Sequence, residues 1–225
     1  MRMQLTNWPL TYCWYLINKK GVLYGYVKKL RRLSAAFLVH SSYNCISLPK
    51  NLLFYYKPLF MKQLLEEYTQ YNVWANETIL SFIQQLSPEQ LDLPQLSSFD
   101  SIRKTLDHMS DCEYNWLKRI NGDSFPEYRS AGFGNDLKAL YGFLIEQSKG
   151  FVEVVQHSDE ESLQKILAYK NLKGVSYENK LYKIIMHVMN HSTYHRGQLV
   201  TMIRGAGGTL LGSTDLIGFY RLIEK

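Results

Sequence analysis

The 225-residue sequence has few cysteines and no long apolar run. Its three cysteines, Cys13, Cys45 and Cys112, show no Cys-x-x-Cys spacing, so no redox or zinc motif can be built on such a pair. Sparse, unpaired cysteines are typical of a reducing compartment, and we expect a cytoplasmic protein. No apolar stretch approaches the ~18 residues of a membrane-spanning helix. We therefore expect no membrane span.

Acidic residues are missing from the beginning of the chain. Residues 1–60 contain nine Lys and Arg and not one Asp or Glu, whereas 61–225 contains 17 basic and 20 acidic residues. At an ordinary acidic content of roughly 12%, a stretch of 60 residues without Asp or Glu arises by chance less than about once in a thousand segments. The composition therefore predicts two parts, a basic extension over 1–60 and a domain over 61–225.

Three explanations compete for residues 1–60. A transit peptide would share the acidic depletion but would also be rich in Arg and Ser. A basic arm for a membrane or a nucleic acid would use the cluster from Lys28 to Arg32 as its anchor. The third explanation is that the protein starts at Met61 and that translated upstream sequence precedes it. We favour the third, because an amphipathic helix begins at Met61, and we expect neither a nucleic-acid partner nor a contribution of 1–60 to the core.

The apolar periodicity of 61–225 predicts an all-α fold. One segment between the third and fourth helices, 166–177, is instead predicted to be a short extended hairpin around Gly174. Gly205 is expected to end the fourth helix, so the glycines that follow it form a turn and not a phosphate-binding loop. One domain of this length buries a single four-helix-bundle core. The predicted helices cover about 62–85, 101–120, 135–157 and 179–204, and the first is expected to turn both Leu64 and Leu65 inward.

Two histidines four residues apart carry the strongest chemical signal. His191 and His195 lie in the stretch His-Ser-Thr-Tyr-His-Arg-Gly-Gln-Leu199. Residues i and i+4 share one face of a helix, so both rings can reach one divalent ion at roughly 2.0–2.1 Å. His187 extends the stripe by one turn. Because His187 and His195 lie about 12 Å apart along the axis, at most two of the three bind the same ion.

The best third ligand is His108, at the margin of the apolar stripe of the second helix. A lone histidine in such a position is more often an ordinary half-buried side chain than a metal ligand. The histidine pair in the fourth helix makes the ligand interpretation of His108 the better one. Cys112 lies one turn after His108. It is either a nucleophile or fourth ligand or, as we favour, a small buried hydrophobic residue.

These residues together resemble the DinB-like family of metal-binding four-helix bundles, which includes thiol S-transferases. The resemblance covers about 165 residues, from Met61 to Lys225, and its histidine motif is its most specific part. Carried over by position, the family's metal triad falls on His108, His191 and His195. His187 is then a packing or second-sphere histidine. The matching segments are Tyr71 to Asn76, Ser101 to Leu117, His187 to Leu199 and Asp215 to Arg221.

Three neutral imidazoles leave the ion its charge and an open position, which suits a Lewis acid. The resemblance implies a low-molecular-weight thiol as the bound group and transfer of its sulfur to an electrophile, in stress response or detoxification. A metal-dependent hydrolase and a non-catalytic metal-binding protein remain alternatives. The metal is Zn, Ni or Fe by ligand type. We also expect a homodimer. No catalytic side chain is assigned, since helical phase directs Tyr194 and Arg196 to either side of His195, toward packing or a dimer contact.

Overall fold

The computed structural model divides the chain into two units, Met1–Lys57 and Pro58–Lys225. In the first unit, β1 (Tyr15–Ile17) and β2 (Leu23–Gly25) pair as antiparallel strands. The rest of the predicted basic extension, with its cluster from Lys28 to Arg32, lies outside the described residues. The residues that the structure describes are 15–17, 23–25, 60–123, 125–171, 173–209 and 212–224.

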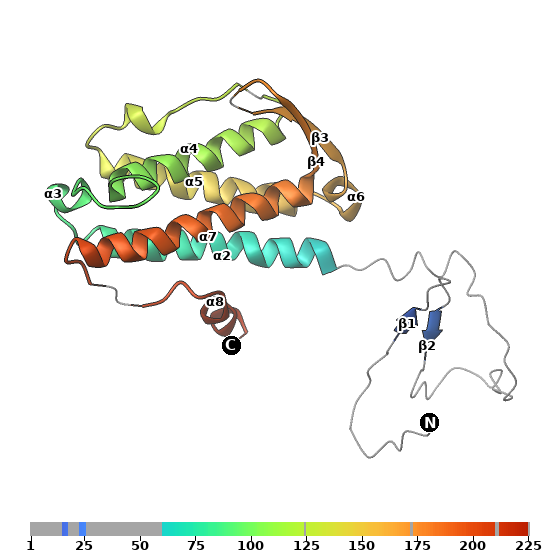
Figure 1. Ribbon diagram of the computed structural model, residues 1–225. Helices are drawn as coiled ribbons and strands as arrows, with labels where there is room; N and C mark the ends of the chain where they lie inside the picture. The colour runs from blue at the N-terminus through green and yellow to red at the C-terminus, as the bar shows by residue number, and fades with distance from the viewer. Residues whose placement is uncertain are drawn as a thin grey trace, which may run out of the picture. The chain divides into compact units, whose positions relative to one another are not determined.

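Four long helices form a bundle in the second unit, as the apolar periodicity predicted. Each packs against two neighbours, in the order α2, α5, α4, α7 around the bundle, so the successive long helices α2 and α4 face each other diagonally. Figure 1 shows that α4 and α5 run in one direction and α2 and α7 in the other. The helices are α2 (Phe60–Ile83), α4 (Ile102–Ile120), α5 (Leu137–Gln156) and α7 (Leu181–Gly205).

The predicted hairpin also forms. Strands β3 (Ile166–Lys170) and β4 (Ser176–Lys180) pair antiparallel, with Tyr169 opposite Tyr177. Gly174 in the turn has φ 76°, a left-handed conformation that glycine adopts without strain. Short elements that the sequence analysis did not identify are α3 (Pro88–Leu91), the 3₁₀ turn η1 (Ser130–Gly132), α6 (Glu160–Leu163) and α8 (Leu216–Ile223).

Helix ends follow local capping chemistry, with one correction. Ser101 begins α4 by accepting a hydrogen bond from the Lys104 N–H at 3.2 Å. Gly205, expected to end the last long helix, is its final helical residue. The left-handed position belongs to Gly207, with φ 79°, and the Gly208 N–H returns to the Ile203 carbonyl at 2.8 Å. The glycines therefore stop the helix, as predicted, but the left-handed position lies two residues after Gly205.

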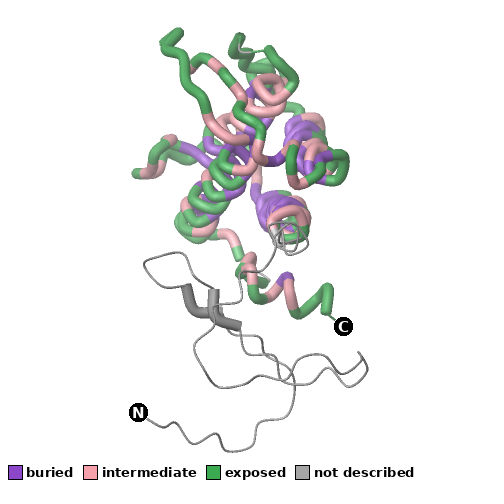
Figure 2. The backbone as a smooth tube through the Cα atoms, turned by 90° about the vertical axis from the view of Figure 1, so that its right-hand side faces the viewer, coloured by how far each residue is buried: buried purple, intermediate pink, exposed green. Residues whose placement is uncertain are grey.

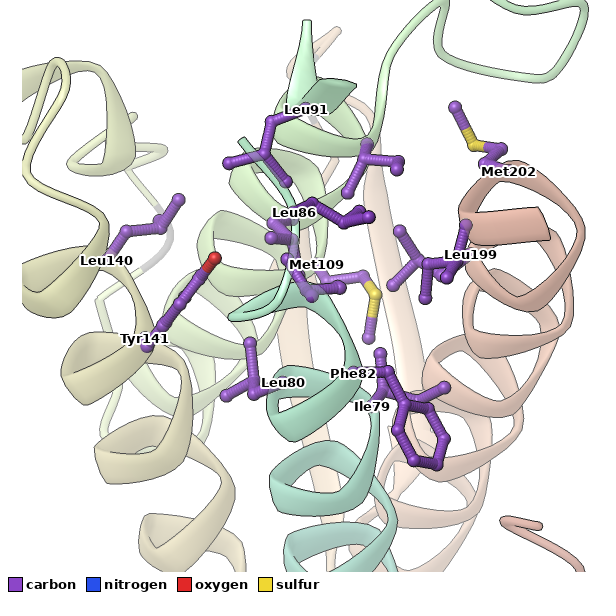
Figure 3. Close-up of a cluster of buried hydrophobic side chains, with 14 of the residues drawn as sticks. Ile79, Leu80, Phe82, Leu86, Leu91, Met109, Leu140, Tyr141, Leu199 and Met202 are labelled. Carbon is purple, nitrogen blue, oxygen red and sulfur yellow. The ribbon is translucent and has the colours of Figure 1, made fainter. Parts of the chain in front are cut away.

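Apolar side chains from all four long helices make up most of the core, and buried residues cluster toward the bundle centre in Figure 2. Figure 3 shows part of it, where Ile79 and Phe82 of α2 meet Met109 of α4 and Leu199 of α7. The predicted inner face of α2 is correct at Leu65 but wrong at Leu64, which is 51% exposed. Adjacent helical residues point about 100° apart, so only one of these two leucines can face inward.

Helix α8 returns against α2. Its Phe219 is buried, and the Phe219 ring lies 5.9 Å from Tyr71 and 5.7 Å from Trp74, centroid to centroid. Trp74 thus packs within the fold. No helix among the described residues has both the length and the apolar character to cross a membrane.

Candidate metal centre

His108 of α4 converges with His191 and His195 of α7. The Nε2 atom of His191 lies 3.0 Å from that of His108 and 3.1 Å from that of His195. The three ligand atoms lie within 4.8 Å of one another, a spacing at which one metal ion can be held. The structure therefore brings together the three histidines that the sequence analysis selected. It can do so because α4 and α7 run antiparallel and place His108 opposite the middle of the α7 stripe.

The ring nitrogens cannot all be satisfied within the group. Burial, reinforced by the neighbouring rings, lowers the pKa of His191 to about 3 and that of His108 to about 4. Burial also lowers the pKa of His195. At neutral pH the three rings are therefore uncharged, and each has one N–H and one lone pair. Moreover, the buried Nδ1 of His191 has no hydrogen-bond partner among the described residues. A cation between the three Nε2 atoms would bind these lone pairs.

Gln198 sets the orientation of one candidate ligand. Its Oε1 lies 2.8 Å from Nδ1 of His195, so that nitrogen donates and the His195 Nε2 keeps its lone pair toward the other rings. The Gln198 amide donates in turn to Ser98 Oγ at 2.7 Å and to the Tyr194 hydroxyl at 3.0 Å. These hydrogen bonds connect helix α7 to the segment that precedes helix α4. The sequence signal for Gln198 was its place three residues after His195, on the same face.

An aromatic ring covers one side of the cluster. Phe99 stacks on His108 with 4.3 Å between ring centroids and lies 5.8 Å from His195. Phe99 comes from the irregular segment before α4, and its role was not found from the sequence because nothing in that segment is periodic. Its ring limits the access of water to the His108 side of the site.

His187 lies outside the three-histidine group. Its ring is 6.1 Å from that of His191 and 5.4 Å from that of Trp116, centroid to centroid. Cys112 also lies outside the group, and burial raises the pKa of its thiol to about 12. A thiol that stays protonated at neutral pH is a poor nucleophile and a poor ligand. Both side chains are therefore placed beside the candidate ligands, where they contribute packing.

A second polar cluster lies at the centre of the bundle, and the sequence analysis missed it. The Glu113 carboxyl group accepts hydrogen bonds from Ser192 and Ser148, each at 2.7 Å, and from Asn72 at 2.9 Å. The Arg196 guanidinium donates to the side-chain oxygens of Asn72 at 2.6 Å and Asn76 at 2.8 Å. All four long helices contribute to this cluster.

The position of Arg196 decides between two alternatives. Its side chain is 1% exposed, so a dimer contact is excluded and the helix-packing alternative is right. Tyr194, on the other side of His195, is 58% exposed. A pair of Asn side chains at i, i+4 in α2 and an Arg in the histidine motif were the only signals for a buried network. Neither identifies its partners without the helix pairing.

Comparisons with known proteins agree with this fold. The DinB family model matches residues 61–219. "Protein DinB" of Bacillus subtilis (strain 168) is 26% identical over 145 residues, 61% of this chain and 83% of that protein. The "Uncharacterized protein YizA" of the same organism is 24% identical over 143 residues, 61% of this chain and 85% of that protein.

Two solved structures share the fold. A DinB-like protein from Bacillus cereus ATCC 10987 matches with a TM-score of 0.51 and 19% identity, over 65% of this chain and 95% of that one. YfiT from Bacillus subtilis, described as a probable metal-dependent hydrolase with an unusual four-helix bundle topology, matches with a TM-score of 0.51 and 13% identity. That match covers 64% of this chain and 87% of YfiT.

Proposed function

The chain belongs to the DinB family, as its motifs predicted, and from that premise we propose that it is a divalent-metal-dependent transferase acting on a small-molecule thiol. One observation carries the proposal: three uncharged imidazoles turn their Nε2 atoms toward one point, and within the described part of the chain no carboxylate joins their group. An all-imidazole donor set suits Zn, Ni or Fe and leaves the ion its full charge.

Each side chain has a defined task in this proposal. A bound divalent ion supplies Lewis acidity, which lowers the pKa of a thiol or water molecule that it binds. The three histidines hold the ion, Gln198 keeps His195 in the ligand tautomer, and Phe99 restricts water on one side. In the transfer, the thiol sulfur bonds to an electrophilic carbon. The thiol proton goes to solvent, and the leaving group departs with its bonding electrons.

A hydrolase is the second candidate, and the description of YfiT as a probable metal-dependent hydrolase supports it. The same site would then activate water in place of a thiol. A metal-binding protein without turnover is the third outcome. We further propose a homodimer in the cytoplasm with a role in stress response or detoxification. Light scattering of the purified chain checks the dimer.

Metal analysis tests the foundation of the proposal. The full chain purified without chelator should carry close to one divalent transition ion. His191→Ala should lower occupancy at least tenfold, because it removes one of three bonds. His187→Ala is the matched control on the same helix stripe and should keep the ion. Full occupancy in His191→Ala would refute the assignment of the triad.

A conjugation assay separates the functions. Glutathione and 1-chloro-2,4-dinitrobenzene serve as thiol and electrophile, and chloride release is followed together with ester hydrolysis. We expect metal-dependent conjugation whose rate rises with pH and disappears in the triad variants, while Cys112→Ser stays active. Ester hydrolysis without conjugation would favour the hydrolase. If Cys112→Ser keeps its metal but loses activity, the protein thiol is the nucleophile.

A further inference from the structure

The surface beside the triad continues as two parallel rows toward the β3–β4 hairpin. On α7 the row runs from His195 through His191 to His187, one turn at a time. On α4 it runs from His108 to Trp116, and the Trp116 ring contacts that of His187 with 5.4 Å between centroids. The hairpin closes this face, because Tyr169 lies edge-on against Trp116 at 5.0 Å.

Arg119 occupies the far end of this face. Its guanidinium carbon lies 4.6 Å from the centroid of the Trp116 ring and 6.0 Å from that of Tyr169. Stacking on two aromatic rings fixes the plane of the guanidinium and limits its motion. Eleven residues separate His108 from Arg119, so both lie on nearly the same side of α4.

This guanidinium lacks an anion. Its Nε is buried without a hydrogen-bond partner, and no carboxylate among the described residues pairs with it. Arg103 and Arg196 also have one buried guanidinium nitrogen each without a partner, but both are paired through their other nitrogens. Arg103 forms two hydrogen bonds to Asp92, at 2.7 and 3.0 Å, and Arg196 donates to two Asn oxygens. A buried, oriented N–H without an acceptor is unfavourable unless a ligand supplies one.

The distance suits one small molecule. Arg119 begins roughly 16 Å beyond His108 along α4, and arginine side chains reach back toward the helix N-terminus. The gap from the triad to the guanidinium is therefore on the order of 10 Å. A thiol with an acidic group several bonds from its sulfur spans this gap, whereas cysteine itself is too short.

We propose that Arg119 is an anion-binding subsite that holds a carboxylate or phosphate group of the ligand whose other end reaches the histidine triad. Trp116 and His187 contact the middle of this ligand. The inference rests on the proposed function for the identity of the sulfur-bearing end. The Arg119 subsite is expected to change the affinity for the ligand, and affinity can be measured without turnover.

Isothermal titration of the full, metal-loaded chain provides the test. The two ligands are glutathione and its diethyl ester, which differ by two carboxylates. We expect glutathione to bind at least tenfold more tightly. Arg119→Leu should remove this preference while leaving the affinity for the ester unchanged. Arg119→Lys, which keeps a charge but not the planar fork, should restore part of it.

Arg129→Leu is the matched control. The Arg129 guanidinium also stacks on two rings, 5.5 Å from Tyr114 and 6.0 Å from Phe143, on another part of α4 and α5. This variant should keep the full preference for glutathione. A wild-type ratio near one, no binding of glutathione, or a preference that survives in Arg119→Leu would overturn the inference. Preserved preference without conjugation would instead reject only the transferase.

Discussion

The bundle contains two polar clusters that share two turns of α7 and differ in how their atoms are satisfied. Ser192 and Arg196, which belong to the central network, immediately follow His191 and His195, which belong to the triad. In the network, the Glu113 carboxyl group meets partners from three other helices. Arg196 donates to two Asn oxygens of α2, although its Nε has no partner among the described residues. In the triad, three Nε2 atoms converge on one point and the buried Nδ1 of His191 has no partner among the described residues.

This difference indicates that one cluster stabilises the bundle and the other binds a ligand. Buried polar groups are tolerated when each donor meets an acceptor, and such networks then hold helices in one register. Three convergent imidazole nitrogens lack such complete pairing and are suited to a shared cation instead. The network should therefore govern stability and the triad should govern metal binding, and the following experiments test that division from the largest expected effect to the smallest.

Arg196→Leu should be the most damaging substitution. It leaves the buried Glu113 carboxyl group without a nearby guanidinium and two Asn oxygens without donors, so the free energy of unfolding should fall by about 3–5 kcal/mol. Urea denaturation of the metal-free chain measures this. Adding Glu113→Gln should cost less than the sum of the two single changes, because the residues share one network. A loss under about 1 kcal/mol would show that the network is dispensable.

His191→Leu should behave in the opposite way. Without metal, it should change the free energy of unfolding by less than about 1 kcal/mol, because it removes a buried Nδ1 that has no partner. With the ion at 100 times its Kd, the wild-type chain should gain about 2.7 kcal/mol and the variant nothing. Unfolding with EDTA and with zinc measures both values. Strong destabilisation in EDTA would contradict the division between the clusters.

Gln198→Leu should weaken metal binding without unfolding the bundle. The loss of the hydrogen bond to His195 should reduce metal affinity by about 10- to 100-fold, or roughly 1.4–2.7 kcal/mol. Competition with a chromogenic chelator measures the change. Tyr194→Phe, which removes only the hydroxyl that accepts from Gln198, should have a smaller effect. Equal effects of the two variants would show that the hydrogen bond from His195 to Gln198 does not orient the His195 ring.

Acid should destabilise the metal-free chain through the triad. The pKa of His108, about 4, and that of His191, about 3, lie below the ordinary value of 6.5. Below pH 6.5 the unfolded chain takes up these protons first. Stability is therefore complete above pH 6.5 and is lost as the pH falls through about 4.

The pH effect is measured against a chain carrying His108→Leu and His191→Leu, whose urea midpoint should fall less steeply, by about 1 kcal/mol over this range after solvent screening. Asp107, whose pKa burial raises to about 6, contributes with the opposite sign and is common to both chains. Equal slopes would mean that the triad histidines are protonated as easily in the folded state.

Removal of residues 1–60 should have the smallest effect. The acidic residues and the match to the family both begin at or just after position 61. A chain that begins at Met61 should therefore bind the same metal and melt within a few degrees of the full chain, a change of about 1 kcal/mol or less. Calorimetry and metal analysis of the shortened chain check this. Aggregation of the shortened chain would contradict it.

The sequence alone predicted the helices and the hairpin, because both rest on local signals. Apolar periodicity located each long helix to within two residues or so of its ends, and the glycine of the turn located the hairpin. Apolar periodicity did not identify α8, because eight residues are too few for a periodic signal. It also failed to show that Leu64 is exposed, because the adjacent Leu65 is equally apolar.

For the candidate site, the sequence determined that His191 and His195 share a helix face, since 3.6 residues per turn require it. Only the tertiary structure decided that His108 meets them, that Gln198 and Phe99 orient them, and that Glu113 and Arg196 join four helices beneath them. Those contacts depend on which helices are neighbours, in which direction they run and how each is rotated. Long-range packing sets these three quantities, and no local pattern of residues records them.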